Sequence, residues 1–115
     1  MEKSLKLLRQ GFESSSTSTP QFNTFFSTFK KEFTAELKKV NATEIQFSKG
    51  HFYISGFFKV NEQMYYFSLS DVRGSEFQRE ISMLYRTAKN NKDYTGGSNN
   101  WVNIETGMIY TMRIK

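Results

Sequence analysis

The longest regular pattern in the chain is a stripe of apolar residues between positions 20 and 41. Its members recur at spacings of three and four, which places them on one side of an α-helix; they are Phe22, Phe25, Phe26, Phe29, Phe33, Leu37 and Val40. Thr19 supplies a hydroxyl cap and Pro20 a favoured first helical position. The pattern therefore predicts an amphipathic helix over about residues 20–41, with the phenylalanine stripe in the core.

From Glu44 onward the apolar period changes to two, which is typical of strands with one buried face. Three such segments, at about 44–48, 52–60 and 64–70, are separated by turn pairs at Lys49-Gly50 and Asn61-Glu62. They predict an antiparallel meander. In the second segment one face carries Phe52, Ile54, Gly56, Phe58 and Val60, and the other carries His51, Tyr53, Ser55, Phe57 and Lys59.

The C-terminal third contains weaker signals. The apolar run at 81–87 fits either a helix or a strand, and residues 90–100 are rich in asparagine and glycine, which predicts a loop. A strand is expected to start at Trp101, and alternation over 108–114 predicts a final strand. The whole pattern predicts an α+β fold, in which one long helix covers one face of a mostly antiparallel sheet of four to six strands. The other sheet face can stay open to solvent.

The N-terminal part is expected to be separate from this domain. Residues 1–12 predict a short helix that Gly11 ends, with Leu5 and Leu8 on one side. Residues 13–19 are serine and threonine with one glutamate, a composition typical of a flexible linker. Residues 20–115 then form a single α+β domain of ordinary size.

The amino-acid composition indicates a folded protein and excludes some classes of site. Aromatic residues make up 17% of the chain, mostly twelve phenylalanines and six tyrosines, which indicates folded structure. The net charge of +5 favours polyanionic partners, although it also serves solubility. The absence of cysteine excludes disulfides and thiolate metal sites and suits a reducing cytoplasm. No stretch approaches the roughly 20 apolar residues of a membrane span, so we expect a soluble, cytoplasmic protein without membrane association.

Nothing in the sequence has the spacing of an active site. His51 is the single histidine, and the acidic residues are scattered one at a time. General base chemistry needs a positioned partner, and a metal site needs several ligands. We therefore predict no catalytic residue, no metal ligand and no cofactor, which leaves a non-enzymatic binding protein.

One candidate binding cluster combines cations with aromatic rings. Arg86, Lys89 and Lys92 lie within seven residues without an acid, and Tyr94 and Trp101 follow closely. Single-stranded nucleic acid is held by cations on its phosphates and flat rings on its bases. A solvated loop beside core aromatics would give the same pattern. The nearby Gly96-Gly97 pair similarly fits either an anion-binding nest or a plain hairpin loop.

A second candidate is the sheet face that the helix leaves uncovered. It carries Tyr53 and Phe57, and Tyr66 is a further candidate for the same face. Exposed rings there would form a stacking surface or a protein interface. Alternatively, residues 1–12 or a partner subunit cover the rings, and in the second case the protein is a homo-oligomer.

The segment around the basic cluster resembles a pattern in small uncharacterised proteins of phages and mobile elements. The matching runs are residues 84–89 (LYRTAK), 92–97 (KDYTGG) and 99–102 (NNWV). The resemblance implies a genomic setting and a host-cell location, and it implies no mechanism. Two functions remain open: a nucleic-acid-binding accessory protein that holds single-stranded DNA or RNA, and an inhibitor of a host defence nuclease, similar to anti-CRISPR proteins, that binds a protein.

Overall fold

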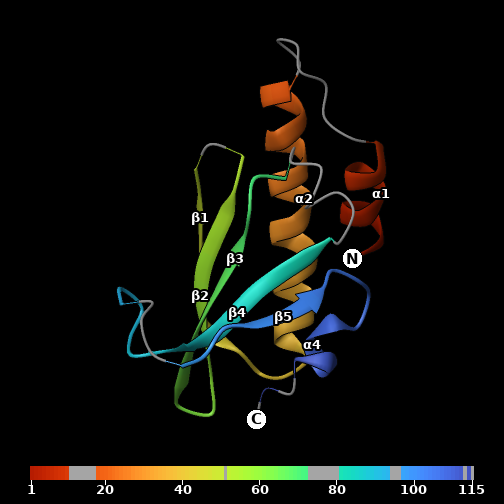
Figure 1. Cartoon of the computed structure of the whole chain (residues 1–115). Helices are drawn as coiled ribbons and strands as arrows, with labels where there is room; N and C mark the ends of the chain where they lie inside the picture. Colours follow the sequence, from red (N-terminus) through yellow and green to blue (C-terminus); the bar gives the residue numbers. More distant parts are fainter. Residues whose placement is uncertain (11–17, 51, 73–80, 94–96, 113, 115) are drawn as a thin grey trace.

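A long helix and a five-stranded antiparallel sheet form the two layers of the computed structural model (Figure 1). The structure describes residues 1–10, 18–50, 52–72, 81–93, 97–112 and 114. The helices are α1 (Glu2–Gln10), α2 (Ser18–Lys38) and α4 (Met108–Thr111). The strands are β1 (Thr43–Lys49), β2 (Ile54–Val60), β3 (Gln63–Leu69), β4 (Ser82–Ala88) and β5 (Asn100–Asn103). The predicted α+β fold is confirmed.

The sheet is a meander in which each strand pairs with the next, in the order β1-β2-β3-β4-β5. The β2–β3 hairpin closes on Asn61 and Glu62, whose φ angles of 49° and 67° are both positive. Two left-handed residues give a hairpin the twist that its strands require. The turn predicted at Asn61-Glu62 is therefore confirmed, and residues 82–87 of the undecided run belong to strand β4.

The strand predicted over residues 108–114 is wrong, because Met108–Thr111 form the short helix α4. Gly107 turns the chain with a φ of 80°. The adjacent residues Met108 and Ile109 are both buried, as is Met112 one turn later, whereas Tyr110 is exposed. Alternate apolar residues in so short a segment fit either period, and the packing of α4 against α2 and β5 decides for the helix.

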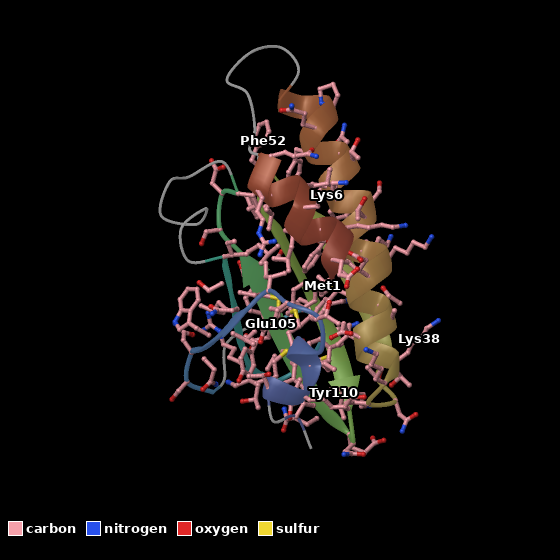
Figure 2. All side chains as sticks on the ribbon, turned by 90° about the vertical axis from the view of Figure 1, so that its right-hand side faces the viewer. Met1, Lys6, Lys38, Phe52, Glu105 and Tyr110 are labelled. Carbon is pink, nitrogen blue, oxygen red and sulfur yellow. The ribbon has the colours of Figure 1, made fainter. Side chains whose placement is uncertain are left out.

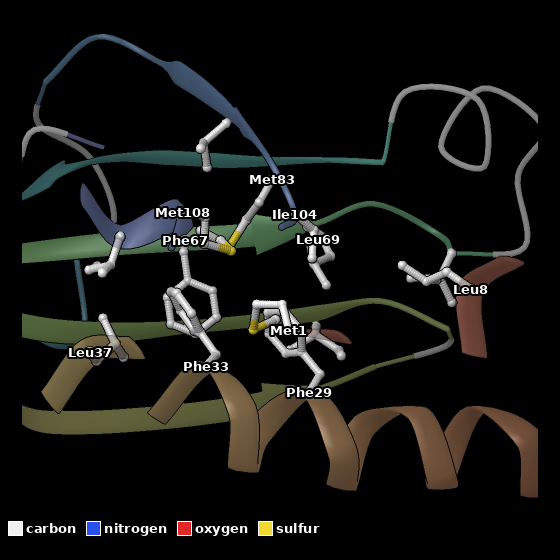
Figure 3. Close-up of a cluster of buried hydrophobic side chains, with 14 of the residues drawn as sticks. Met1, Leu8, Phe29, Phe33, Leu37, Phe67, Leu69, Met83, Ile104 and Met108 are labelled. Carbon is white, nitrogen blue, oxygen red and sulfur yellow. The ribbon is translucent and has the colours of Figure 1, made fainter. Parts of the chain in front are cut away.

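The phenylalanine stripe of α2 forms the centre of the core, as predicted. Phe25, Phe29 and Phe33 are fully buried. Figure 3 shows Phe29 and Phe33 pointing from α2 towards the sheet, where Phe33 meets Phe67. The ring centroids of Phe33 and Phe67 are 5.0 Å apart with a T-shaped geometry, which aromatic pairs favour. The helix and the sheet are thus joined mainly through rings.

Helix α1 packs on α2, and both helices lie on the same side of the sheet (Figures 1 and 2). Leu8 is fully buried and Met1 nearly so. The buried Ser4 donates hydrogen bonds from its backbone N–H and its Oγ to Glu32 Oε1 of α2, both at 2.7 Å. The predicted linker lies almost entirely outside the described residues. The α1 helix therefore contributes to the core and leaves the far sheet face uncovered.

The contacts of Glu32 make the stability of the α1–α2 pair depend on pH. Partial burial raises the pKa of the Glu32 carboxyl, but hydrogen bonds from Ser4 and Lys3 and the nearby N-terminal ammonium outweigh burial, so the pKa lies below its ordinary value of 4.5. When the pKa of a carboxyl is lower in the folded state than in the unfolded state, the ionised group stabilises the fold at pH values above the unfolded-state pKa. This stabilisation is lost as the pH falls through the folded-state pKa.

We therefore expect Glu32→Gln to lower the free energy of unfolding at neutral pH and to have a smaller effect at an acid pH below 4.5. Urea denaturation at both pH values measures the difference. Glu105→Gln, at an exposed carboxylate, is the control. An equal loss at both pH values would show that the contribution of Glu32 to stability does not depend on the ionisation of its carboxyl group.

Candidate functional site

The sheet face opposite α2 carries alternate residues of every strand, and we call it the open face. Register and alternation place on it Gln46, Ser48, Ser55, Phe57, Lys59, Met64, Tyr66, Ser68, Leu84, Arg86, Ala88, Trp101 and Asn103. In both Figure 1 and Figure 2 the helices lie on the other side of the sheet. Within the described part of the chain, no helix covers the open face.

The central row of the open face combines two aromatic rings and a guanidinium. Strand register places Phe57 beside Tyr66 and Tyr66 beside Arg86. The Phe57 and Tyr66 ring centroids are 5.4 Å apart. The Arg86 guanidinium carbon lies 5.5 Å from the centre of the Tyr66 ring, within the range of a cation–π contact. Three strands thus hold these groups in one line, and each is kept in place by its neighbour.

The neighbouring row of residues across the strands consists mainly of short side chains and ends in the exposed indole of Trp101. Three serines from β1, β2 and β3 are followed by Leu84 and Trp101; the serines are Ser48, Ser55 and Ser68. Trp101 is 59% exposed, although tryptophan is usually well buried. The short serine side chains of this row lie beside the half-buried Phe57 and Tyr66. The open face therefore offers flat rings beside a shallow polar strip.

At the end of the open face near the β2–β3 turn, one ammonium group lies close to two carboxylates. Lys59 Nζ lies 3.2 Å from Glu44 and 3.4 Å from Glu62. The hydrogen bond to Glu44 and the two negative charges raise the pKa of Lys59. A hollow of about 550 Å³ adjoins these residues and continues past Met64 and Ala88 to the loop after β4. Two carboxylates close to one ammonium make this end unsuitable for an isolated phosphate.

The exposed lysines of the predicted basic cluster lie in the loop that follows β4. Lys89 and Lys92 are both solvent-exposed. Asn90 Oδ1 accepts hydrogen bonds from the backbone N–H groups of Lys92 and Asp93 at 2.8 and 2.9 Å, an arrangement that tightens the turn. Gly97 N–H donates to Thr87 O at 3.1 Å and holds the return of the loop against β4. Both lysines therefore lie beyond the end of β4, and Lys89 lines the hollow beside the open face.

The structure brings together three of the residues selected from sequence, namely Phe57, Arg86 and Trp101, on three different strands. Tyr53 precedes β2, is 45% exposed and lies with its ring against Gly50. Tyr94, Gly96 and His51 lie outside the described residues. Tyr66, only a secondary candidate in the sequence, is the centre of the open face, because it contacts both Phe57 and Arg86.

Other kinds of site have less support. In the described ranges, no group of three or more histidine, aspartate or glutamate side chains is arranged to hold a metal ion. The same part of the chain contains no helix with the length and apolar character needed to cross a bilayer. The open face combines the half-buried Phe57, Tyr66 and Arg86 with the exposed Trp101.

No family model matches the chain, and comparisons with curated proteins and with solved structures gave no significant match. Function is therefore inferred from the residues of the open face themselves.

Proposed function

We propose that the protein binds single-stranded nucleic acid, DNA or RNA, on the open face. The observation that carries the proposal is the row of Phe57, Tyr66 and Arg86 across three adjacent strands, with the exposed Trp101 beside it. Unstacked bases bind by stacking on aromatic rings and on guanidinium planes. A shallow sheet surface suits splayed bases, whereas duplex DNA hides the faces of its bases and admits a protruding helix or ribbon into its major groove.

Charge supports the same proposal. The chain carries a net charge of +5. Lys89 and Lys92 extend from the loop next to the open face, where they can contact phosphates of a strand whose bases lie on the rings. Each neutralised phosphate releases counterions, so the affinity should fall steeply as salt concentration rises.

The first test is fluorescence anisotropy of labelled single-stranded DNA, RNA and duplex DNA, each titrated with the protein at a low and a high salt concentration. We expect tighter binding to single strands than to the duplex, with strong weakening at high salt. No binding even at low salt would refute the proposal.

The matched variants are Trp101→Ala and Tyr110→Ala. Both rings are exposed, at 59% and 63%, so neither change should affect folding much. Trp101 lies on the open face, whereas Tyr110 belongs to α4 on the helix side (Figure 2). Loss of one stacked base costs about 1–3 kcal/mol, so Trp101→Ala should weaken binding roughly fivefold to a hundredfold. Tyr110→Ala should leave binding unchanged, and equal effects would place the site elsewhere.

A second pair of variants separates phosphate contacts from net charge. Replacing Lys89 and Lys92 by alanine removes two charges beside the open face, and replacing Lys3 and Lys6 removes two exposed charges on α1. We expect only the first change to weaken binding and to reduce the slope of log affinity against log salt, by about one per lost phosphate contact.

The open face also supports a second candidate function, binding to a host defence nuclease. Tryptophan, tyrosine and arginine are the residues that most often dominate protein interfaces, and all three occur here. In the phage or mobile-element setting that the resemblance implies, either function would be exerted in the host-cell cytoplasm. A stable complex with one protein and no affinity for nucleic acid at low salt would favour this candidate.

A further inference from the structure

Helix α2 segregates its charges between two sides. Glu32 accepts hydrogen bonds from Ser4 of α1, and the buried Glu36 pairs with Lys39 at 2.7 Å. The outward side carries lysines only: Lys30, Lys31 and Lys38, all solvent-exposed. Across the described ranges, none of these three lysines has a carboxylate partner. One side of the helix therefore has uncompensated positive charge.

The lysines surround a shallow hollow of about 580 Å³, which we call the lysine groove. Its lining is Phe26, Ser27, Lys30, Lys31, Thr34, Ala35 and Lys38. Phe26 is half-buried, Ala35 is exposed, and the lysine stems add methylene groups to the apolar surface. Figure 2 shows Lys38 extending from α2 away from the rest of the molecule. The lysine groove thus has an apolar floor between cationic walls.

Strand β1, next to α2, adds Lys49 to the positive surface, and its edge is unsuited to pairing with a further strand. Lys49 Nζ of β1 lies 5.3 Å from the centre of the Phe26 ring and 2.8 Å from Asn23 Oδ1. Strand β1 is an edge strand, but its register shifts between Thr43 and Gln46 and Glu44 has a φ of 49°. Such bulges and an edge lysine are devices that discourage strand addition. A ligand is therefore expected to lie along α2.

We propose that the lysine groove docks an acidic segment of a protein partner. Carboxylates of the segment would pair with Lys30, Lys31 and Lys38, and its apolar side chains would lie on the floor formed by Phe26 and Ala35. The lining contains a single aromatic ring, the half-buried Phe26, and Lys49 Nζ lies 5.3 Å from its centre, so successive bases of a nucleic acid would find no row of rings to stack on. The proposal does not depend on nucleic-acid binding, since the lining of the lysine groove belongs to α2, and α2 lies on the side of the sheet opposite the open face (Figure 1).

The probe for this site is a fluorescein-labelled peptide in which glutamate and leucine alternate, measured by anisotropy at low and moderate salt. Lys31→Glu with Lys38→Glu should weaken its binding roughly tenfold, because each exposed pair contributes modestly and reversal adds repulsion. Lys3→Glu with Lys6→Glu on α1 makes the same change in net charge and should have little effect. Equal weakening by both pairs, or no binding to the unaltered protein, would overturn the proposal.

Two further measurements complete the test. Circular dichroism checks folding, and if the reversal destabilises α2, Lys31→Gln with Lys38→Gln replaces it, with a smaller expected loss of affinity. A peptide of glutamate and serine should bind more weakly than the leucine peptide, because it cannot use the apolar floor. Equal affinity for the two peptides would show a general anion surface and would contradict docking of a segment that uses the floor.

Discussion

Phe33→Ala should lower the free energy of unfolding by about 3–5 kcal/mol. Phe33 is fully buried at the centre of the helix–sheet interface. Its ring centroid lies 5.3 Å from that of Phe29, 6.2 Å from that of Phe58 and 5.0 Å from that of Phe67. Truncation removes the contacts with all three rings and leaves a cavity whose walls come from both layers, so neither layer can relax to fill it alone.

Urea denaturation followed by circular dichroism measures this loss. Phe26→Ala, at a half-buried position of the same helix, is the matched control and should cost less. A loss below about 1 kcal/mol for Phe33→Ala would mean that this ring is not part of a close-packed core.

Leu8→Ala should lower the free energy of unfolding by about 2–5 kcal/mol. Leu8 is fully buried although it belongs to α1, which sequence patterns separate from the main domain. Figure 3 places it in the same buried cluster as Leu69 and Phe29. Its side chain therefore contributes to the core between α2 and the sheet, in addition to the hydrogen bonds that Ser4 donates to Glu32.

Arg9→Ala is the control for Leu8→Ala, since Arg9 is the next residue and is exposed. Exposed substitutions of this kind usually change stability by less than about 0.5 kcal/mol. Equal and small effects of the two changes would support the division in which residues 20–115 fold as a domain by themselves. A large effect of Leu8→Ala alone would make α1 an integral part of that domain.

The open face and the lysine groove give the molecule two surfaces of different character on its two sides. Aromatic rings dominate the first and lysines dominate the second. If both proposals hold, the protein can bind a nucleic acid strand and a protein partner at the same time. Both experiments place their charge controls at Lys3 and Lys6 of α1, so a general effect of net charge would be recognised in each.

The pairing of Phe57 with Tyr66 at the centre of the open face could be predicted from the sequence. A two-residue turn at Asn61-Glu62 sets the β2–β3 register, and that register places Phe57 opposite Tyr66. The position of Arg86 beside Tyr66 could not be predicted in this way. A long connection separates β3 from β4, so no local turn sets the register that brings Arg86 onto Tyr66.

By itself, the sequence determined the elements whose signal is local. The phenylalanine stripe specifies α2, and the period of two with a short turn specifies the β2–β3 hairpin, because neighbouring residues alone decide which side is apolar. Tertiary structure decided the rest. Packing against α2 turned residues 108–111 into a helix, and the uncovered side of the sheet became a candidate site because α1 and α2 both lie on the other side. These outcomes depend on contacts between distant residues, which no local pattern records.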